Sequence, residues 1–174
     1  MAQPIEEREG YHIERPNREK AASKATKAAV ILLLLVSTGL MLIVTVGGWE
    51  KLAGAKAVQV GYILLYLLIA FYVARWNRGV LTIAAALAIV LGIFAAIAGP
   101  EWFSRDKTGF ASPLLDESVL GLVTLLIVPV QILLIAFSMR GFQQAWNVEV
   151  EVPDGQHYRP GHYDEPGQGQ PAPA

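Results

Sequence analysis

A few hydrogen-bonding side chains lie within the apolar stretches of this chain, and they are its first candidates for chemistry. Tyr62 and Tyr66 are four residues apart and would share one face of a helix, with Gln59 one turn before them. Gln131 lies in a later apolar stretch. Such amides and hydroxyls can line a polar groove for a neutral or lipidic molecule, or hydrogen-bond between helices inside a bundle. The sequence leaves both interpretations open.

A proline interrupts the last apolar stretch. Pro129 has no amide hydrogen and leaves the carbonyl near Leu125 without its helical partner, so we expect a helix kink there. The side chains of Thr124 and Gln131 could satisfy the freed backbone groups. A broken helix that binds substrate is the alternative, but transporters pair such breaks in two related halves, and the earlier stretches show no matching break.

The residue types that pumps, cytochromes and hydrolases require are missing from these stretches. No Asp, Glu, Lys, Arg or His lies between their ends. His12, His157 and His162 lie in the terminal segments, so an embedded haem has no axial ligands, and His157 with His162 is only a weak metal candidate. The chain has no cysteine, no phosphate-binding loop and no serine with a suitable base. We expect no enzyme activity, no metal site and no cofactor.

Four apolar stretches, at residues 28–48, 57–74, 80–99 and 119–139, would position these side chains. Each is long enough for a helix to cross about 30 Å of hydrocarbon. Charged residues, 17% of the chain, all lie outside them. We predict an all-α membrane protein with a four-transmembrane-helix bundle over residues 28–146. A polar segment (1–27) precedes the bundle, and an extended segment with a disordered tail rich in Pro and Gly (147–174) follows it.

Lysine and arginine are distributed unevenly around the four stretches. Ten of the 14 lie in the terminal segments and in the turn at residues 75–79, and the other four lie in the two loops on the opposite side. The positive-inside rule therefore places both termini in the cytoplasm. The short turn predicts that the second and third helices form an antiparallel hairpin. The usage of Ala, Gly, Pro and Arg indicates a GC-rich bacterial genome, and we therefore expect the protein in a bacterial inner membrane.

One face of the third stretch consists of small residues. Ala84, Ala88, Gly92 and Ala96 recur every four residues. In lipid, small residues at this spacing let two helix backbones approach closely. The stripe predicts a helix-packing face, either within the bundle or against another subunit.

Two segments outside the apolar stretches could bind partners. The loop before the fourth stretch contains aromatic residues at headgroup depth, which offer an external docking surface. The same loop has four acidic residues, and a weaker alternative is an enzyme that acts on lipid headgroups with a divalent ion bound by them: Glu101, Asp106, Asp116 and Glu117. Residues 148–152 alternate apolar and acidic side chains, which predicts an extended strand. No partner strand is recognisable, so this segment is either solvated or an edge offered to another protein.

The end of the first stretch resembles a known family. A glycine-bearing span that ends in Gly47-Gly48-Trp49-Glu50-Lys51-Leu52 is similar to the opening of small four-span DoxX-type membrane proteins. The following loop is much shorter here, and a helix end with an interfacial anchor explains the same residues. The resemblance therefore implies no function or residue role.

Together these features predict a non-catalytic accessory or scaffold subunit of a larger membrane assembly. Its expected partners are the lipid bilayer and other membrane subunits, and no nucleic acid. The alternative is a small transporter or carrier of a neutral or lipidic molecule, with Gln59, Tyr62, Tyr66 and Gln131 as the polar lining.

Overall fold

The computed structural model describes residues 10–104 and 113–157. The chain divides into two compact units. The larger unit comprises residues 17–147, and the smaller comprises Met1–Pro16 with Val148–Ala174. Most of the predicted disordered tail, residues 158–174, lies outside the described residues, as does the middle of the loop before the fourth helix.

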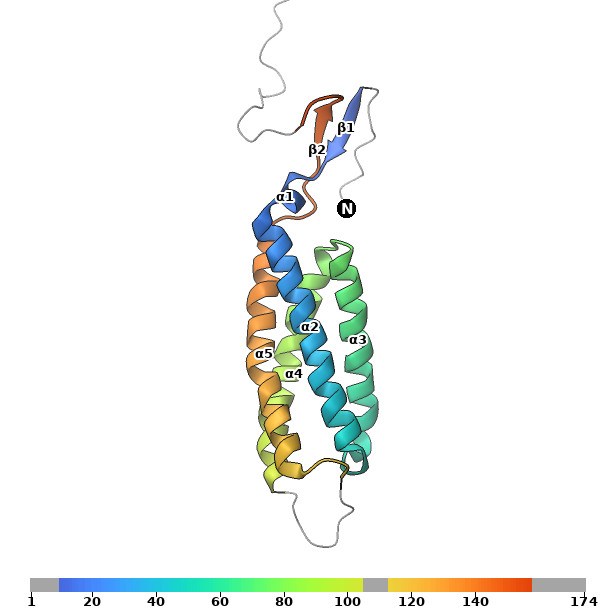
Figure 1. Cartoon of the computed structure of the whole chain (residues 1–174), viewed down its shortest axis with the longest axis vertical. Coiled ribbons are helices and arrows are strands. Elements are labelled where there is room, and N and C mark those ends of the chain that lie inside the picture. Colours follow the sequence, from blue (N-terminus) through green and yellow to red (C-terminus); the bar gives the residue numbers. More distant parts are fainter. Residues whose placement is uncertain (1–9, 105–112, 158–174) are drawn as a thin grey trace, which may run out of the picture. The chain divides into compact units, whose positions relative to one another are not determined.

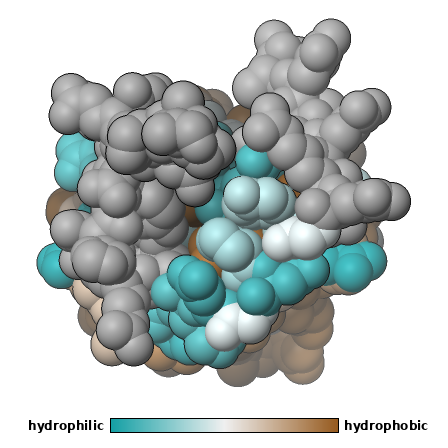
Figure 2. Space-filling view, turned by 90° about the horizontal axis from the view of Figure 1, so that it is seen from above, coloured by the Kyte–Doolittle hydropathy of each residue, from teal (hydrophilic) through white to brown (hydrophobic). Residues whose placement is uncertain are grey.

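Four long apolar helices make up the larger unit (Figure 1). Among the described residues, these are the helices long and apolar enough to cross a membrane: α2 (Ala21–Gly47), α3 (Lys56–Ala74), α4 (Gly79–Phe103) and α5 (Glu117–Gln143). Their outward faces carry many exposed Leu, Ile, Val and Phe side chains. On the face that Figure 2 shows, hydrophilic residues gather in front and hydrophobic residues lie behind them. The prediction of a mostly helical chain with four candidate membrane spans is confirmed.

The helices extend beyond the apolar stretches. Polar residues next to a stretch can continue the backbone hydrogen bonding of the helix outside the hydrocarbon layer. Helix α2 begins at Ala21, within the predicted polar segment, and follows the short α1 (Pro16–Glu19). Two 3-10 turns, η1 (Trp49–Lys51) and η2 (Ala53–Ala55), connect α2 to α3.

Asp116 caps the start of α5. Its carboxylate accepts a hydrogen bond from the Ser118 amide at 2.8 Å. The Ser118 hydroxyl also donates to this carboxylate, and these bonds hold the pKa of Asp116 below its usual value. The carboxylate also complements the positive end of the helix dipole, so this residue fixes where the fourth span begins.

The small-residue face of α4 packs largely against α5, its main neighbour. Ala84 and Ala88 are fully buried. A Cβ atom built on Gly92 would lie 3.5 Å from Cβ of Gln131, an ordinary packing distance. Three of the four predicted stripe positions therefore lie at or near this contact within one chain.

The stripe changes position near the end of α4. Ala96 is exposed, whereas Ala95 and Gly99 are buried. An α-helix has 3.6 residues per turn, so a strict spacing of four gradually rotates off one face. The contact consequently moves from Ala96 to its neighbour Ala95.

Helices α3 and α4 contact each other little, although the turn between them is short. Helix α2 packs against α3 and α5, and α5 packs against α4. Apolar burial does not drive helices together in lipid, and close approach depends on small facing residues. The small-residue face of α4 packs against α5. Helices α3 and α4 are therefore joined by a short turn, as predicted, but they do not pack closely against each other.

Helix α5 continues past Pro129 to Gln143. Thr124 donates to the carbonyl of Leu120 at 2.7 Å. The Gln131 side chain is hydrogen-bonded to residues of α2 and α3. The expectation that these two side chains satisfy the backbone freed by the proline is therefore wrong.

Among the described residues, Ser138 on α5 has a buried Oγ with no hydrogen-bond partner. A buried unpaired polar group costs about 1–3 kcal/mol. We expect Ser138→Ala to stabilise the protein by up to about 1 kcal/mol, measured as a higher thermal unfolding midpoint in detergent. Ser37→Ala should lower the midpoint because it removes a hydrogen-bond acceptor. A lower midpoint for Ser138→Ala would contradict this account.

The smaller unit contains a two-stranded antiparallel ribbon (Figure 1). Strand β1 (Tyr11–Glu14) pairs with β2 (Val150–Pro153), and Glu14 lies opposite Val150. Next to the ribbon, Arg15 donates to the Glu149 carboxylate from Nη2 at 2.6 Å and from Nε at 3.0 Å. The expectation that residues 148–152 have no partner strand is wrong, because β1 carries a matching extended segment at the other end of the sequence.

Candidate ligand-binding cavity

A cavity of about 510 Å³ lies among the four helices of the larger unit. Its volume is within the range of about 300–1,000 Å³ typical of small-molecule sites. Its walls come from all four long helices and from the connection between α2 and α3: Met41, Val44, Lys51, Leu52, Ala55, Val58, Gln59, Tyr62, Leu91, Phe94, Ala95, Ile97, Ala98, Glu101, Trp102, Thr124 and Ile127.

The exposed part of the wall lies where α3 and α4 diverge. Val58 on α3 and Phe94 and Ile97 on α4 line the cavity, and all three are more than half exposed. These residues belong to candidate membrane spans, so this opening would face lipid in a bilayer. An apolar molecule could therefore enter sideways from the lipid.

The inner wall is apolar and well packed. Met41, Val44, Ala95 and Ile127 are buried, and Trp102 is 2% exposed. The aromatic residue Trp102 was expected in an interfacial loop, but it lies on α4 and packs into the bundle. This wall offers dispersion contacts to a hydrocarbon group.

Polar groups line the cavity near the turns between α2 and α3. Gln59 accepts a hydrogen bond from the Thr45 hydroxyl. Lys51 forms an ion pair with Glu117, and these side chains are only 11% and 13% exposed. Glu101 lines the same region from α4. The cavity thus combines a long apolar wall with a charged and amide-bearing end, which suits an amphipathic molecule.

The structure divides the four residues of the predicted polar groove into two pairs. Gln59 and Tyr62 line the cavity, whereas Tyr66 and Gln131 are buried beside it. The Tyr62 and Tyr66 rings meet edge to face, with centroids 6.0 Å apart. One pair is available to a ligand and the other belongs to the interior of the bundle.

Tyr66 and Gln131 take part in a hydrogen-bond chain across three helices. The Tyr66 hydroxyl donates to Oε1 of Gln131 at 2.9 Å, and Nε2 of Gln131 donates to Oγ of Ser37 at 2.9 Å. The Ser37 hydroxyl donates to the Leu33 carbonyl at 2.7 Å. Every member has a partner, so this chain joins helices and needs no ligand to complete it.

The acidic residues that were candidate ligands for a divalent ion lie in different surroundings. Glu101 lines the cavity, Asp116 caps α5 and Glu117 pairs with Lys51. Asp106 lies outside the described residues. Asp116 and Glu117 therefore have structural roles and are not held ready for an ion.

Sequence reasoning missed Lys51 as a cavity residue and treated it only as a loop charge. A signal was present, because Lys51 follows the first span and Glu117 begins the fourth. Oppositely charged residues at span ends on one side of a membrane are natural pairing candidates. Sequence reasoning also missed the pairing of His12 and Glu14 with His157 in the terminal ribbon.

No protein-family model, curated protein or solved structure matches this chain. The DoxX-like opening therefore carries no family assignment. The fold and the cavity define a class instead: a mostly helical protein with four candidate membrane spans and an amphipathic cavity between them.

Proposed function

We propose that the protein is a non-catalytic integral membrane protein that binds a lipidic or other mainly apolar molecule and acts as its carrier. The observation that supports this function best is the cavity among the four long helices, with its exposed apolar rim on α3 and α4 and its polar end at Gln59 and Lys51. A lipid tail would occupy the apolar wall, and its polar group would lie near the charged end. No step of this function requires a covalent intermediate or a proton relay.

We further propose a bacterial inner membrane location with both termini in the cytoplasm. Pairing of β1 with β2 supports a common side for the two ends, because strands separated by a bilayer cannot pair. The excess of Lys and Arg in the terminal segments and in the turn at residues 75–79 supports the cytoplasmic side. Cysteine labelling at each end in intact cells tests this orientation.

Filling the cavity tests the carrier function. Ala98 lines the cavity, whereas Ala96, two residues earlier on the same helix, is exposed and does not. We expect Ala98→Phe to reduce co-purifying lipid, and transfer of a fluorescent lipid between vesicles, at least about tenfold, equivalent to about 1.4 kcal/mol of binding free energy. Ala96→Phe should leave both unchanged.

Lipid extraction with mass spectrometry and a vesicle transfer assay provide the readouts. Equal thermal unfolding midpoints would show that both variants are folded. Equal lipid content and transfer in wild type and Ala98→Phe would contradict the carrier function.

An accessory or scaffold role is the second candidate. It is favoured by the ribbon, because among the described residues β1 and β2 pair only with each other and each leaves one edge open. Open strand edges are templates for strand addition by a partner. Pull-down from native membranes, followed by mass spectrometry, would support this role if stable companions are lost when Val150 is replaced by proline.

A further inference from the structure

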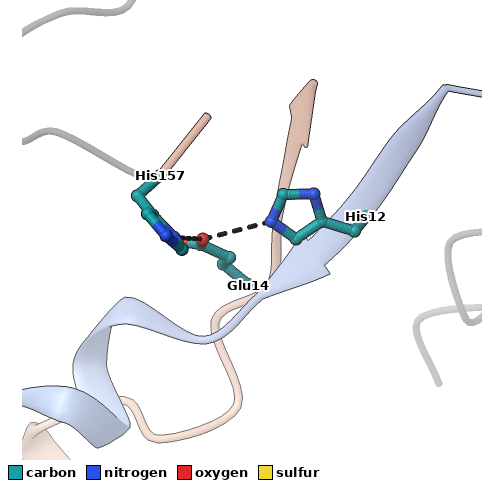
Figure 3. Close-up of side chains that lie close together, drawn as sticks. All are labelled: His12, Glu14 and His157. Carbon is teal, nitrogen blue, oxygen red and sulfur yellow. Dashed lines mark hydrogen bonds and ion pairs between the residues drawn. The ribbon is translucent and has the colours of Figure 1, made fainter. Parts of the chain in front are cut away.

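Two histidines and a glutamate converge in the terminal ribbon (Figure 3). His12 and Glu14 are two residues apart on β1, so their side chains point to the same face. Nε2 of His12 lies 3.1 Å from Oε1 of Glu14, and Nδ1 of His157 lies 2.9 Å from the same oxygen. The ligand atoms of these three residues all lie within 4.8 Å of one another.

A tight turn after β2 brings His157 to this position. The Gln156 amide donates to the Pro153 carbonyl at 3.1 Å, and Gly155 has a φ of +84°, which glycine adopts without strain. The Asp154 amide donates to the Gly10 carbonyl at 2.9 Å and extends the pairing of the two chain ends. The position of His157 therefore follows from the register of the ribbon and its turn.

Asp154 contacts the other nitrogen of the His12 ring. Nδ1 of His12 lies 3.3 Å from Oδ1 of Asp154. A neutral imidazole has one N–H group, and donation to Asp154 leaves a lone pair on Nε2 facing the Glu14 carboxylate. Two electron-rich groups at this distance need a cation between them, either a second proton on the ring or a metal ion. In metal sites, a carboxylate commonly orients a ligating histidine in this way.

We propose that His12, Glu14 and His157 bind a divalent transition-metal ion of the Zn²⁺ type, with Asp154 orienting His12. Two imidazole nitrogens and one carboxylate oxygen are ligands that such ions favour. Ligands of a tetrahedral ion at about 2.0–2.1 Å lie about 3.4 Å apart, close to the separations of 3.1 and 2.9 Å here. The His157 side chain is 92% exposed, so water completes the coordination.

The ligands come from both ends of the sequence. An ion held by His12, Glu14 and His157 would tie β1 to the segment after β2, 143 residues later. Binding to the folded ribbon alone would stabilise it by mass action. Metal binding would therefore stabilise the pairing of the two ends of the chain in the terminal ribbon.

A metal titration of the full-length protein tests this site. Protein purified in detergent without a histidine tag is titrated with ZnCl₂ by calorimetry, and with CoCl₂ by visible absorption. A proton is the competing cation, and the hydrogen bond that the protonated His12 ring donates to Glu14 raises the pKa of His12, so the titrations are run near pH 8. We expect one ion per chain and a Co²⁺ spectrum typical of low coordination number.

Four substitutions test the site: two at ligands, one at the orienting residue and one control. His12→Gln and His157→Gln should each weaken Zn²⁺ binding more than tenfold, and Asp154→Asn should weaken it about tenfold. His162→Gln is the matched control in the same tail and should have no effect. Unchanged helical circular dichroism would show that each variant is folded.

Several outcomes would overturn the site. They are absence of Zn²⁺ binding to wild type, unchanged affinity in His12→Gln, and loss of binding in His162→Gln but not in His157→Gln. The first would mean that protons alone neutralise the cluster. The last would mean that tail histidines bind the ion without the ribbon.

Discussion

Replacing Gly48 with alanine should destabilise the protein by about 1–3 kcal/mol, the usual cost of inserting an extra group into a packed interior. A Cβ atom at Gly48 would lie 2.6 Å from Cη2 of Trp102 and 3.0 Å from the carbonyl oxygen of Val44. Neither group can easily move away. Trp102 is 2% exposed and packs with Leu52 and Leu120, and the Val44 carbonyl is part of the backbone of α2.

The matched control is Gly54→Ala, a change of the same size in the same connection between α2 and α3. A Cβ atom at Gly54 would have nothing within 4 Å. We expect a lower thermal unfolding midpoint in detergent for Gly48→Ala and an unchanged midpoint for Gly54→Ala. Because Trp102 forms a wall of the cavity, Gly48→Ala should also reduce lipid binding. Equal midpoints for the two variants would show that Trp102 is less firmly held than its burial indicates.

Breaking the hydrogen-bond chain inside the bundle should have an effect of similar size. Gln131→Met keeps the approximate volume of the side chain but removes the acceptor for Tyr66 and the donor to Ser37. Tyr66→Phe removes only the first of these hydrogen bonds. Each single change leaves a buried polar group unpaired, which costs about 1–3 kcal/mol.

The double variant distinguishes pairing from packing. In Tyr66→Phe with Gln131→Met, both partners of the first hydrogen bond are apolar, so the loss of stability should be smaller than the sum of the single losses. A coupling of about 0.6 kcal/mol, and at most about 1.7 kcal/mol, is the range measured between membrane helices. Unfolding in mixed detergent micelles measures all four proteins. Strict additivity would mean that the two side chains do not interact.

The metal site illustrates what local sequence patterns cannot reveal. His12 and His157 are separated by nearly the whole chain, and neither lies in a recognisable ligand motif. Their proximity depends on the register in which Tyr11 faces Pro153 and Glu14 faces Val150. Register is a property of the paired strands, so an extended segment considered alone could not predict it.

The cavity was partly predictable, because Gln59 and Tyr62 were identified as candidate polar lining residues and both line it. The sequence could not show that Tyr66 and Gln131, the other two candidates, are buried in the bundle and do not line the cavity. Tyr62 and Tyr66 share one helix face by spacing, yet only Tyr66 meets a partner from α5. Which hydroxyl bonds to another helix depends on where that helix lies, and sequence spacing contains no such information.

The sequence by itself determined that four apolar stretches without charged residues form long helices, because the energetic cost of a charge or an unpaired backbone group in hydrocarbon acts on each segment separately. Only the tertiary structure decided that the small face of α4 packs largely against α5, that α3 and α4 diverge around a cavity, and that the two chain ends pair. These choices depend on side-chain packing and hydrogen bonding between segments distant in sequence.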